Sequence, residues 1–248
     1  MTFKIITHAL RMVFSNIIPT LHVTAVLYLM TQAVSIIGNL ISVGQVHTGG
    51  IMAQIEAGEL FPTALFWVFF IFSMLVSIIA TSWMAVAWHR YVLLGEQSSF
   101  VPKYPKGLVG RYFFTALGAT LLIMVPAIIL LIFVGMAVGY AIANPVVTII
   151  FSIVFLYLLW RVTMTLPVLS VGNNMSIRDS WKHTAKLSAP IFGVSVIIGT
   201  LTTLAQFLPT TIPGAWIISI LLGWVSTVVG LSILTTIYGI CVESREID

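Results

Sequence analysis

The chain has 248 residues and a formal net charge of +4, and 59% of its residues are hydrophobic while only 7% are charged. Soluble domains carry about 25% charged residues, so this composition excludes a water-soluble globule and, with it, disordered and coiled-coil chains. The single cysteine, Cys241, excludes a disulfide scaffold and a multi-cysteine metal site. The class that remains is a polytopic integral membrane protein.

Six apolar stretches are long enough to cross a bilayer as helices. About 20 mostly apolar residues span the hydrocarbon core, and no stretch alternates strictly between apolar and polar residues as barrel strands do. We therefore expect an all-α fold that forms a single integral membrane domain over residues 1–248, with six transmembrane helices grouped as three hairpins. The expected spans are residues 20–43, 61–88, 113–140, 145–167, 188–208 and 214–242.

Positive charge is distributed unevenly over the connections between these spans. The first connection carries His47, Glu56 and Glu59 but no lysine or arginine, and the third and fifth connections are also free of positive charge. All 11 lysines and arginines therefore fall on the other side of the expected spans. Because cytoplasmic loops of membrane proteins are enriched in these residues, both termini are predicted to be cytoplasmic. The short outer connections favour a bacterial inner membrane.

Two basic segments, residues 3–17 and 176–187, have the periodicity of amphipathic helices. Ser176 followed by Asp179 resembles a capping box, which predicts that the second helix begins there. The basic faces consist of Lys4, His8 and Arg11 in the first segment and of Arg178, Lys182 and Lys186 in the second. Both helices are expected to lie in the membrane interface on the cytoplasmic side. They either anchor the chain to the lipid bilayer or recognise anionic lipid.

Two further patterns agree with the span boundaries. Aromatic residues near the expected cytoplasmic ends are typical of rings that lie at the headgroup level; they include Trp88, Tyr112, Trp160, Trp181 and Tyr238. Ser195 and Gly199 have the small-xxx-small spacing that lets two helix backbones approach closely.

Polar residues inside the expected spans are candidates for function or for helix packing. They are His22, Gln32, Asn39 and Gln206. Each can form a hydrogen bond with a neighbouring helix, and the alternative is that they line a polar cavity of a transporter. No aspartate or glutamate lies well inside a span, which argues against a proton- or sodium-coupled carrier.

Arg161 lies near the cytoplasmic end of the fourth expected span. An ionisable group at this depth either anchors the helix at the headgroups or has a specific partner. The specific hypothesis is an ion pair with Glu96, the only acidic residue in the second connection.

Sequence patterns of catalysis are missing. The five histidines show no metalloprotease spacing, and the chain has no phosphate-binding glycine loop and no nucleophile elbow. We therefore expect no catalytic residue, no cofactor and no metal. Nucleic acid is not an expected partner, because membrane topology already accounts for the basic residues.

The stretch Trp88-His89-Arg90-Tyr91-Val92-Leu93-Leu94-Gly95-Glu96 resembles a signature of uncharacterised bacterial six-helix inner-membrane proteins. The resemblance extends to Arg161 with Leu166-Pro167 and to Ser180-Trp181. In layout the chain is similar to the membrane domains of glycerophosphodiester phosphodiesterases and to YciC-like proteins. This resemblance implies a six-helix bundle and assigns no activity, and the chain has no counterpart of the catalytic phosphodiesterase domain.

The same stretch suggests a polar cluster on the cytoplasmic side. Its candidate members are His89, Arg90, Glu96, Arg161 and Lys182, with Gly95 ending the helix. The cluster either docks a lipid headgroup or a partner, or only terminates the helix and sets topology.

The function that we expect is that of a non-enzymatic inner-membrane protein, an accessory or scaffold whose cytoplasmic face engages lipid or another membrane protein. Two alternatives stay open. A small transporter or permease component would need a polar cavity at His22, Gln32, Asn39 or Gln206. A membrane-embedded lipid-modifying enzyme would need His89, Arg90, Glu96 and Arg161 to meet in one pocket.

Topology gives the first testable prediction. In a Cys241→Ser background, Glu56→Cys should react with a membrane-impermeant maleimide added outside intact cells, whereas Lys103→Cys should react only after lysis. A reporter fused behind Asp248 should be active in the cytoplasm. A periplasmic reporter signal, or labelling at position 56 only from the cytosol, would contradict the predicted sidedness.

Overall fold

The computed structural model describes residues 1–43, 63–138, 145–206 and 215–247. All regular secondary structure in this part of the chain is helical, and six of the helices are long and apolar enough to cross a membrane. The predicted all-α, multi-pass class is therefore confirmed. The first, third and fifth connections, with His47, Glu56 and Glu59, lie outside the described residues.

The observed helices match the expected spans to within six residues at each end, and every span except one is a single helix. They are α1 (Thr2–Phe14), α2 (Ile17–Val43), α4 (Ala64–Leu94), α5 (Leu108–Val138), α6 (Pro145–Val162), α7 (Thr165–Ser170), α8 (Ile177–His183), the 3-10 helix η3 (Thr184–Leu187), α9 (Ser188–Gln206) and α10 (Ala215–Cys241). The exception is the fourth span, expected over 145–167, because α6 ends at Val162 and a short helix follows. Pro167 has no N–H to donate to the carbonyl of Thr163. The backbone N–H of Leu166 donates to that carbonyl instead, at 2.9 Å, in an i→i−3 hydrogen bond that interrupts the α-helical pattern.

Local sequence signals mark two helix ends as predicted. Ser176 is the N-cap of α8, and its hydroxyl oxygen accepts the backbone N–H of Asp179 at 3.1 Å. Gly95 ends α4 with a φ of 65°, a left-handed conformation that only glycine adopts without steric cost. The predicted segment 176–187 is split between α8 and η3, and the chain then continues directly into α9.

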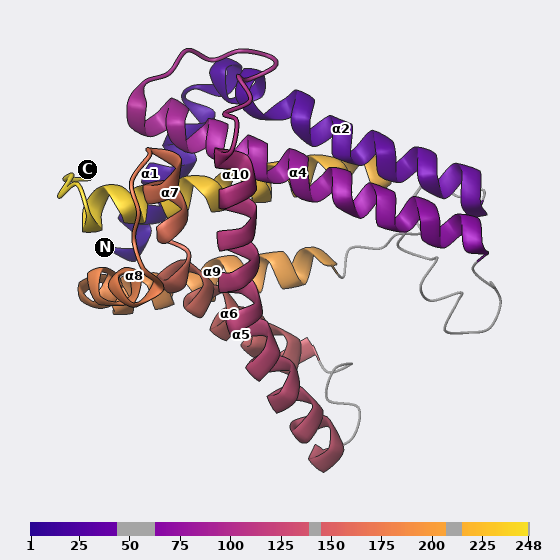
Figure 1. Ribbon diagram of the computed structural model, residues 1–248. Helices are drawn as coiled ribbons and strands as arrows, with labels where there is room; N and C mark the ends of the chain where they lie inside the picture. The colour runs from indigo at the N-terminus through magenta and orange to yellow at the C-terminus, as the bar shows by residue number, and fades with distance from the viewer. Residues whose placement is uncertain (44–62, 139–144, 207–214, 248) are drawn as a thin grey trace.

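Figure 1 shows both termini at one end of the molecule, together with α1, α7 and α8. We call this the terminal end. From there α2 and α4 run side by side to the opposite end, while α5 descends away from them. α9 packs mainly along α6, and α10 packs mainly against α1 and α4. The grouping into three hairpins therefore stays a prediction, since α9 and α10 are not each other's main neighbours.

The buried core lies close to the terminal end. Ile5, Ala9 and Val13 of α1 are fully buried, and they join large side chains from the last turns of α4 and from α7, the start of α9 and the second half of α10. Away from this core, α2, α4 and α5 expose many large apolar side chains, such as Phe114 at 69% and Phe133 at 66%. Such exposure is expected of helices whose surroundings are lipid.

Four of the aromatic residues expected at the headgroups are instead buried. Trp88 is fully buried, and Tyr112, Trp160 and Tyr238 are each 5% exposed or less. They belong to the core because short helices cover the span ends at which they lie. Trp181, by contrast, is 40% exposed. The pattern of aromatic residues near helix ends therefore located the ends but misassigned the environment of most of these rings.

Close packing between α6 and α9 depends on Gly199. A Cβ atom added there would lie 3.2 Å from the backbone nitrogen of Ile153 and 3.3 Å from its Cα, closer than normal van der Waals contact. Ser195, one turn earlier, is also buried. The packing role expected for the Ser195–Gly199 spacing is thus confirmed.

This contact gives a prediction on stability. Gly199→Ala should lower the melting temperature in mild detergent, because overpacking a helix contact costs about 1–3 kcal/mol. The matched control is Gly118→Ala in α5, where an added Cβ meets nothing within 4 Å. That control should be neutral or stabilising by up to about 1 kcal/mol, since alanine is the better helix former. Equal melting temperatures for the two variants would contradict the α6–α9 contact.

Candidate functional site

Arg161 occupies a closed polar niche near the terminal end. Its side chain comes from the last turn of α6, and the residue is only 6% exposed. Nε donates to Oγ1 of Thr184 at 3.2 Å, Nη1 donates to the hydroxyl of Tyr157 at 3.0 Å, and Nη2 donates to the carbonyl of Trp181 at 2.8 Å. The guanidinium carbon lies 3.7 Å from the centroid of the Trp181 ring, in cation–π geometry.

The niche fixes α8 and η3 onto the end of α6. The hydroxyl of Ser180 donates to the carbonyl of Arg161 at 2.6 Å, so side chain and backbone of the arginine both contact the following segment. The Tyr157 hydroxyl also meets the hydroxyl of Ser188, the first residue of α9, at 2.6 Å. The guanidinium of Arg161 therefore contacts both α8 and η3, while the Ser180 and Tyr157 hydroxyls add further links across the same junction.

The charge of Arg161 has only neutral partners in the described part of the chain. All three acceptors are uncharged oxygens, and the ion pairs found among the described residues join Arg90 to Glu96 and Arg245 to Glu243. The predicted ion pair of Arg161 with Glu96 is therefore wrong. Glu96 lies beyond the end of α4, where Arg90 is the nearest cation along the same helix.

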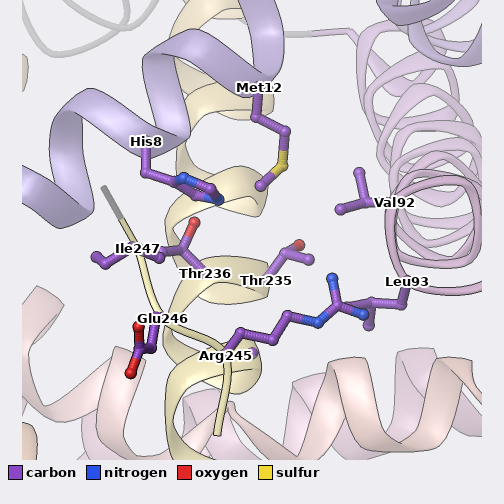
Figure 2. Close-up of a pocket in the computed structure, with 10 residues that line it drawn as sticks. His8, Met12, Val92, Leu93, Thr235, Thr236, Arg245, Glu246 and Ile247 are labelled. Carbon is purple, nitrogen blue, oxygen red and sulfur yellow. The ribbon is translucent and has the colours of Figure 1, made fainter. Parts of the chain in front are cut away.

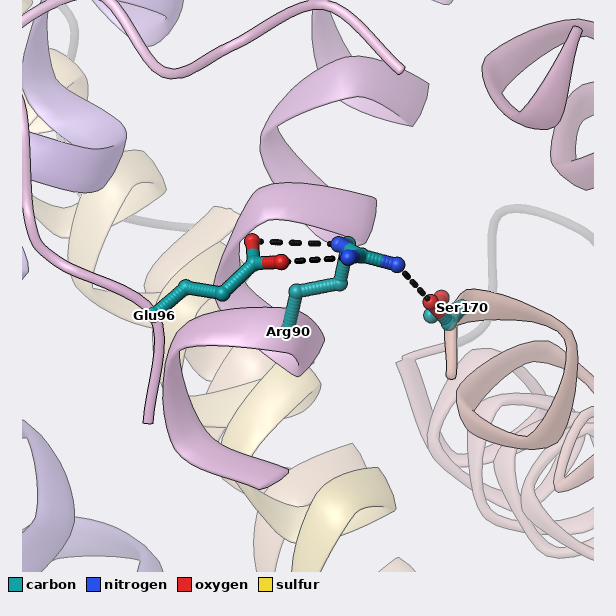
Figure 3. A network of polar contacts seen from close by, with 3 residues as sticks. All are labelled: Arg90, Glu96 and Ser170. Carbon is teal, nitrogen blue, oxygen red and sulfur yellow. Dashed lines mark hydrogen bonds and ion pairs between the residues drawn. The ribbon is translucent and has the colours of Figure 1, made fainter. Parts of the chain in front are cut away.

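Arg90 and Glu96 form a second, separate contact. Nε of Arg90 donates to Oε2 of Glu96 at 3.0 Å, its Nη2 pairs with Oε1, and its Nη1 donates to the carbonyl of Ser170 at 3.0 Å, as Figure 3 shows. The pair thus joins the end of α4 to the end of α7. Arg111 makes a parallel link, donating from Nη2 to Oδ1 of Asn174 at 2.8 Å.

His89 is not at the surface, where the sequence placed it. It is fully buried, with Nδ1 at 2.8 Å from Oγ1 of Thr235 and Nε2 at 3.3 Å from the hydroxyl of Tyr112. The Thr235 hydroxyl donates its one proton to the carbonyl of Leu231 at 2.8 Å. Nδ1 therefore donates to Thr235. His89 bridges α4, α5 and α10.

The predicted polar cluster is therefore divided among three places. His89 lies in the core, Arg90 and Glu96 pair beside α7, and Arg161 lies between α6 and α8. Lys182 is exposed on α8. The lipid-enzyme alternative required the first four of these side chains to share one pocket, and each group instead has its own partners. The described residues contain no group of three metal-ligating side chains.

Two of the four polar residues inside the expected spans have local partners in the structure. His22 packs against Phe100, with 4.0 Å between the ring centroids, and Gln32 donates to Oγ1 of Thr31 at 3.3 Å. Asn39 is 9% exposed. The side chain of Gln206 lies outside the part of the chain that the structure describes.

Figure 2 shows a small pocket where the C-terminal tail folds back on α1 and α10. Arg245 extends along it toward Leu93, and His8 and Thr236 lie on the side of α1 and α10. Its volume is about 90 Å³. That is enough for a few water molecules and well below the roughly 300 Å³ at which small-molecule sites begin. The pocket is too small to hold a lipid chain.

A larger groove runs between α5, α6 and α8. Its volume is about 620 Å³, and its walls are the apolar side chains of Leu122, Pro126, Leu158 and Val162 among others. Arg178 and Trp181 form its edge at α8. The sequence predicts Arg178 on a basic stripe, but it does not indicate that α5 is a neighbour of this helix.

Some partners of Arg161 could have been found from the sequence. Tyr157 precedes Arg161 by four residues, so the two share a helix face. Trp181 and Thr184 come from another helix, and their contact with Arg161 depends on the fold.

Comparison with protein-family models, with curated proteins and with solved structures found no match. The geometry itself defines the class. This is a multi-pass α-helical membrane protein whose terminal end is built around satisfied arginines.

The niche of Arg161 gives a further prediction. Arg161→Lys should destabilise the protein by about 1–3 kcal/mol, because an ammonium cannot keep three divergent hydrogen bonds and the planar stacking on Trp181. Arg178→Lys is the matched control, since Arg178 is exposed on α8 and surface substitutions usually change stability by less than about 0.5 kcal/mol. Thermal unfolding in detergent measures both. If Arg161→Lys melts with the wild type, the niche does not hold α8.

Proposed function

We propose that this is a non-enzymatic inner-membrane protein, an accessory or scaffold, whose terminal end faces the cytoplasm and binds anionic lipid headgroups. The observation that carries the proposal is the arrangement of α1 and α8. Each helix packs one face into the protein and exposes cations beside exposed apolar side chains.

Helix α1 has three distinct faces. Ile5, Ala9 and Val13 point into the core, which supports a helix fixed to the protein and not one held only by lipid. Beside that face, Phe3 is 75% exposed and Phe14 is 50% exposed. Exposed Lys4 and Arg11 complete the helix. Apolar side chains in the acyl boundary and cations at the headgroups are the pattern of an interfacial helix.

Helix α8 repeats the arrangement on the other side of the terminal end. Ser180 is buried against the end of α6, and Trp181 is partly exposed. The cations Arg178, Lys182 and Lys186 are all exposed. The hydroxyl of Thr2 in α1 donates to the carbonyl of Pro190 in α9 at 3.2 Å, so α1 contacts the helix that follows the α8–η3 segment.

Unpaired charge supports lipid as the partner. Among the described residues, none of the five cations on α1, α8 and η3 forms an ion pair with a carboxylate. Basic residues near an anionic membrane surface each contribute about 1 kcal/mol of attraction. A scaffold with this surface binds anionic lipid or the anionic face of another membrane protein.

The proposal is tested by comparing lipid headgroups. Added phosphatidylglycerol should raise the melting temperature in detergent more than phosphatidylcholine of the same chain length. Neutralising Lys4, Arg11, Arg178, Lys182 and Lys186 together with glutamine should remove most of this difference, because the attraction is electrostatic.

The matched control exchanges each of these lysines for arginine and each arginine for lysine, which preserves the charge. It should keep the preference for phosphatidylglycerol. If the wild type responds equally to both lipids, the proposed function is wrong.

A further inference from the structure

We propose that the groove between α5, α6 and α8 is a binding site for one anionic glycerophospholipid, with an acyl chain along α5 and α6 and the phosphate at Arg178. This inference rests on the proposed function and names the site and the ligand class. It goes further than a general attraction to headgroups, because it assigns one lipid to one place.

The size and lining of the groove fit a lipid chain. Its volume of about 620 Å³ lies within the range of roughly 300–1,000 Å³ that small-molecule sites occupy. Leu122 and Pro126 of α5 face Leu158 and Val162 of α6 across it. All four side chains are apolar and lie on helices that span the membrane, so hydrocarbon and not water is the occupant that they favour.

The charge at the groove's edge selects the headgroup. Arg178 lines the groove on the same helix as Trp181, and no carboxylate pairs with it among the described residues. Asp179 is adjacent in sequence, but its carboxylate accepts the hydroxyl of Ser176, the N-cap of α8, at 2.6 Å. An acyl chain in the groove therefore ends beside a free guanidinium, which pairs with phosphate in a bidentate manner.

A second cation lies behind the same tryptophan. The guanidinium of Arg161 stacks on the Trp181 ring at 3.7 Å and is bonded only to neutral oxygens. A buried cation without a counter-charge is costly, and an anion at Arg178 would offset part of that cost. The two arginines thus make this edge of the groove more favourable for a phosphate than an isolated surface arginine would be.

The site is tested by native mass spectrometry of the full-length protein, released from bilayers that contain equal amounts of phosphatidylglycerol and phosphatidylcholine with identical chains. We expect one phosphatidylglycerol molecule to remain bound to the wild type. Leu122→Trp should abolish this retention by filling the groove. Leu121→Trp is the matched control, because Leu121 is similarly exposed on α5, at 50% against 56% for Leu122, and does not line the groove.

A second pair of variants tests the headgroup. Arg178→Gln should lower the preference for phosphatidylglycerol over phosphatidylcholine roughly fivefold, the effect of one basic residue near a phosphate, while a lipid of either kind is still retained. Lys186→Gln, which removes an exposed cation of the same segment outside the groove, should leave the preference within about twofold.

The outcomes separate the site from the general proposal. The site is wrong, and the proposed function stays intact, if Leu122→Trp and Leu121→Trp retain the same amount of lipid. The same holds if Arg178→Gln and Lys186→Gln lose the preference for phosphatidylglycerol equally. If the wild type retains both lipids equally, the site and the proposed function are both wrong. If Leu122→Trp does not fold, Leu122→Gln against Leu121→Gln asks the same question, because a polar side chain in the groove disfavours an acyl chain.

Discussion

A charged side chain cannot be left in hydrocarbon without partners, and this constraint determines where the few ionisable groups of the chain lie. Only 7% of the residues are charged, and the partly buried arginines each have their own partners. Arg90 has a carboxylate and a carbonyl, and Arg161 has two hydroxyls, a carbonyl and an aromatic ring. The short helices α7 and α8 supply backbone carbonyls to these two arginines, so the charges help to fix the packing of this end.

The sequence was sufficient for the spans because their signal is local. Length and hydropathy locate each apolar run, and capping chemistry at Ser176 and Gly95 locates two helix ends without any knowledge of tertiary structure. The break after Val162 was missed, although Pro167 stood inside the expected span. A proline removes one hydrogen bond, but whether a helix then kinks or stops depends on what covers the freed groups.

The sequence did not indicate how each helix is rotated about its own axis, and therefore which side chains face the core. His89 and Arg90 are adjacent, and a step of 100° around α4 puts the first in the core and the second on the surface. A soluble helix reveals its buried face by its apolar stripe, whereas α4 is apolar on every side. The candidate cluster of His89, Arg90 and Arg161 was therefore assembled by position along the chain, and the fold distributes its members over three sets of neighbours.

Helices α1 and α8 show how a basic amphipathic segment can pack one face against the protein and still expose cations and apolar side chains on its other faces. With about 3.6 residues per turn, α1 directs Ile5 and Ala9 into the core and leaves Phe3 and Lys4 exposed on its other sides. Packing against the protein fixes the orientation of each helix. In the proposed contact with phosphate, its cations would therefore lose less conformational freedom than those of a free peptide. On α8 this fixation passes through Trp181, which contacts Arg161 on one side and the groove on the other. A lipid bound in the groove as proposed would also stabilise the α6–α8 junction, since a ligand that binds only the folded arrangement stabilises it.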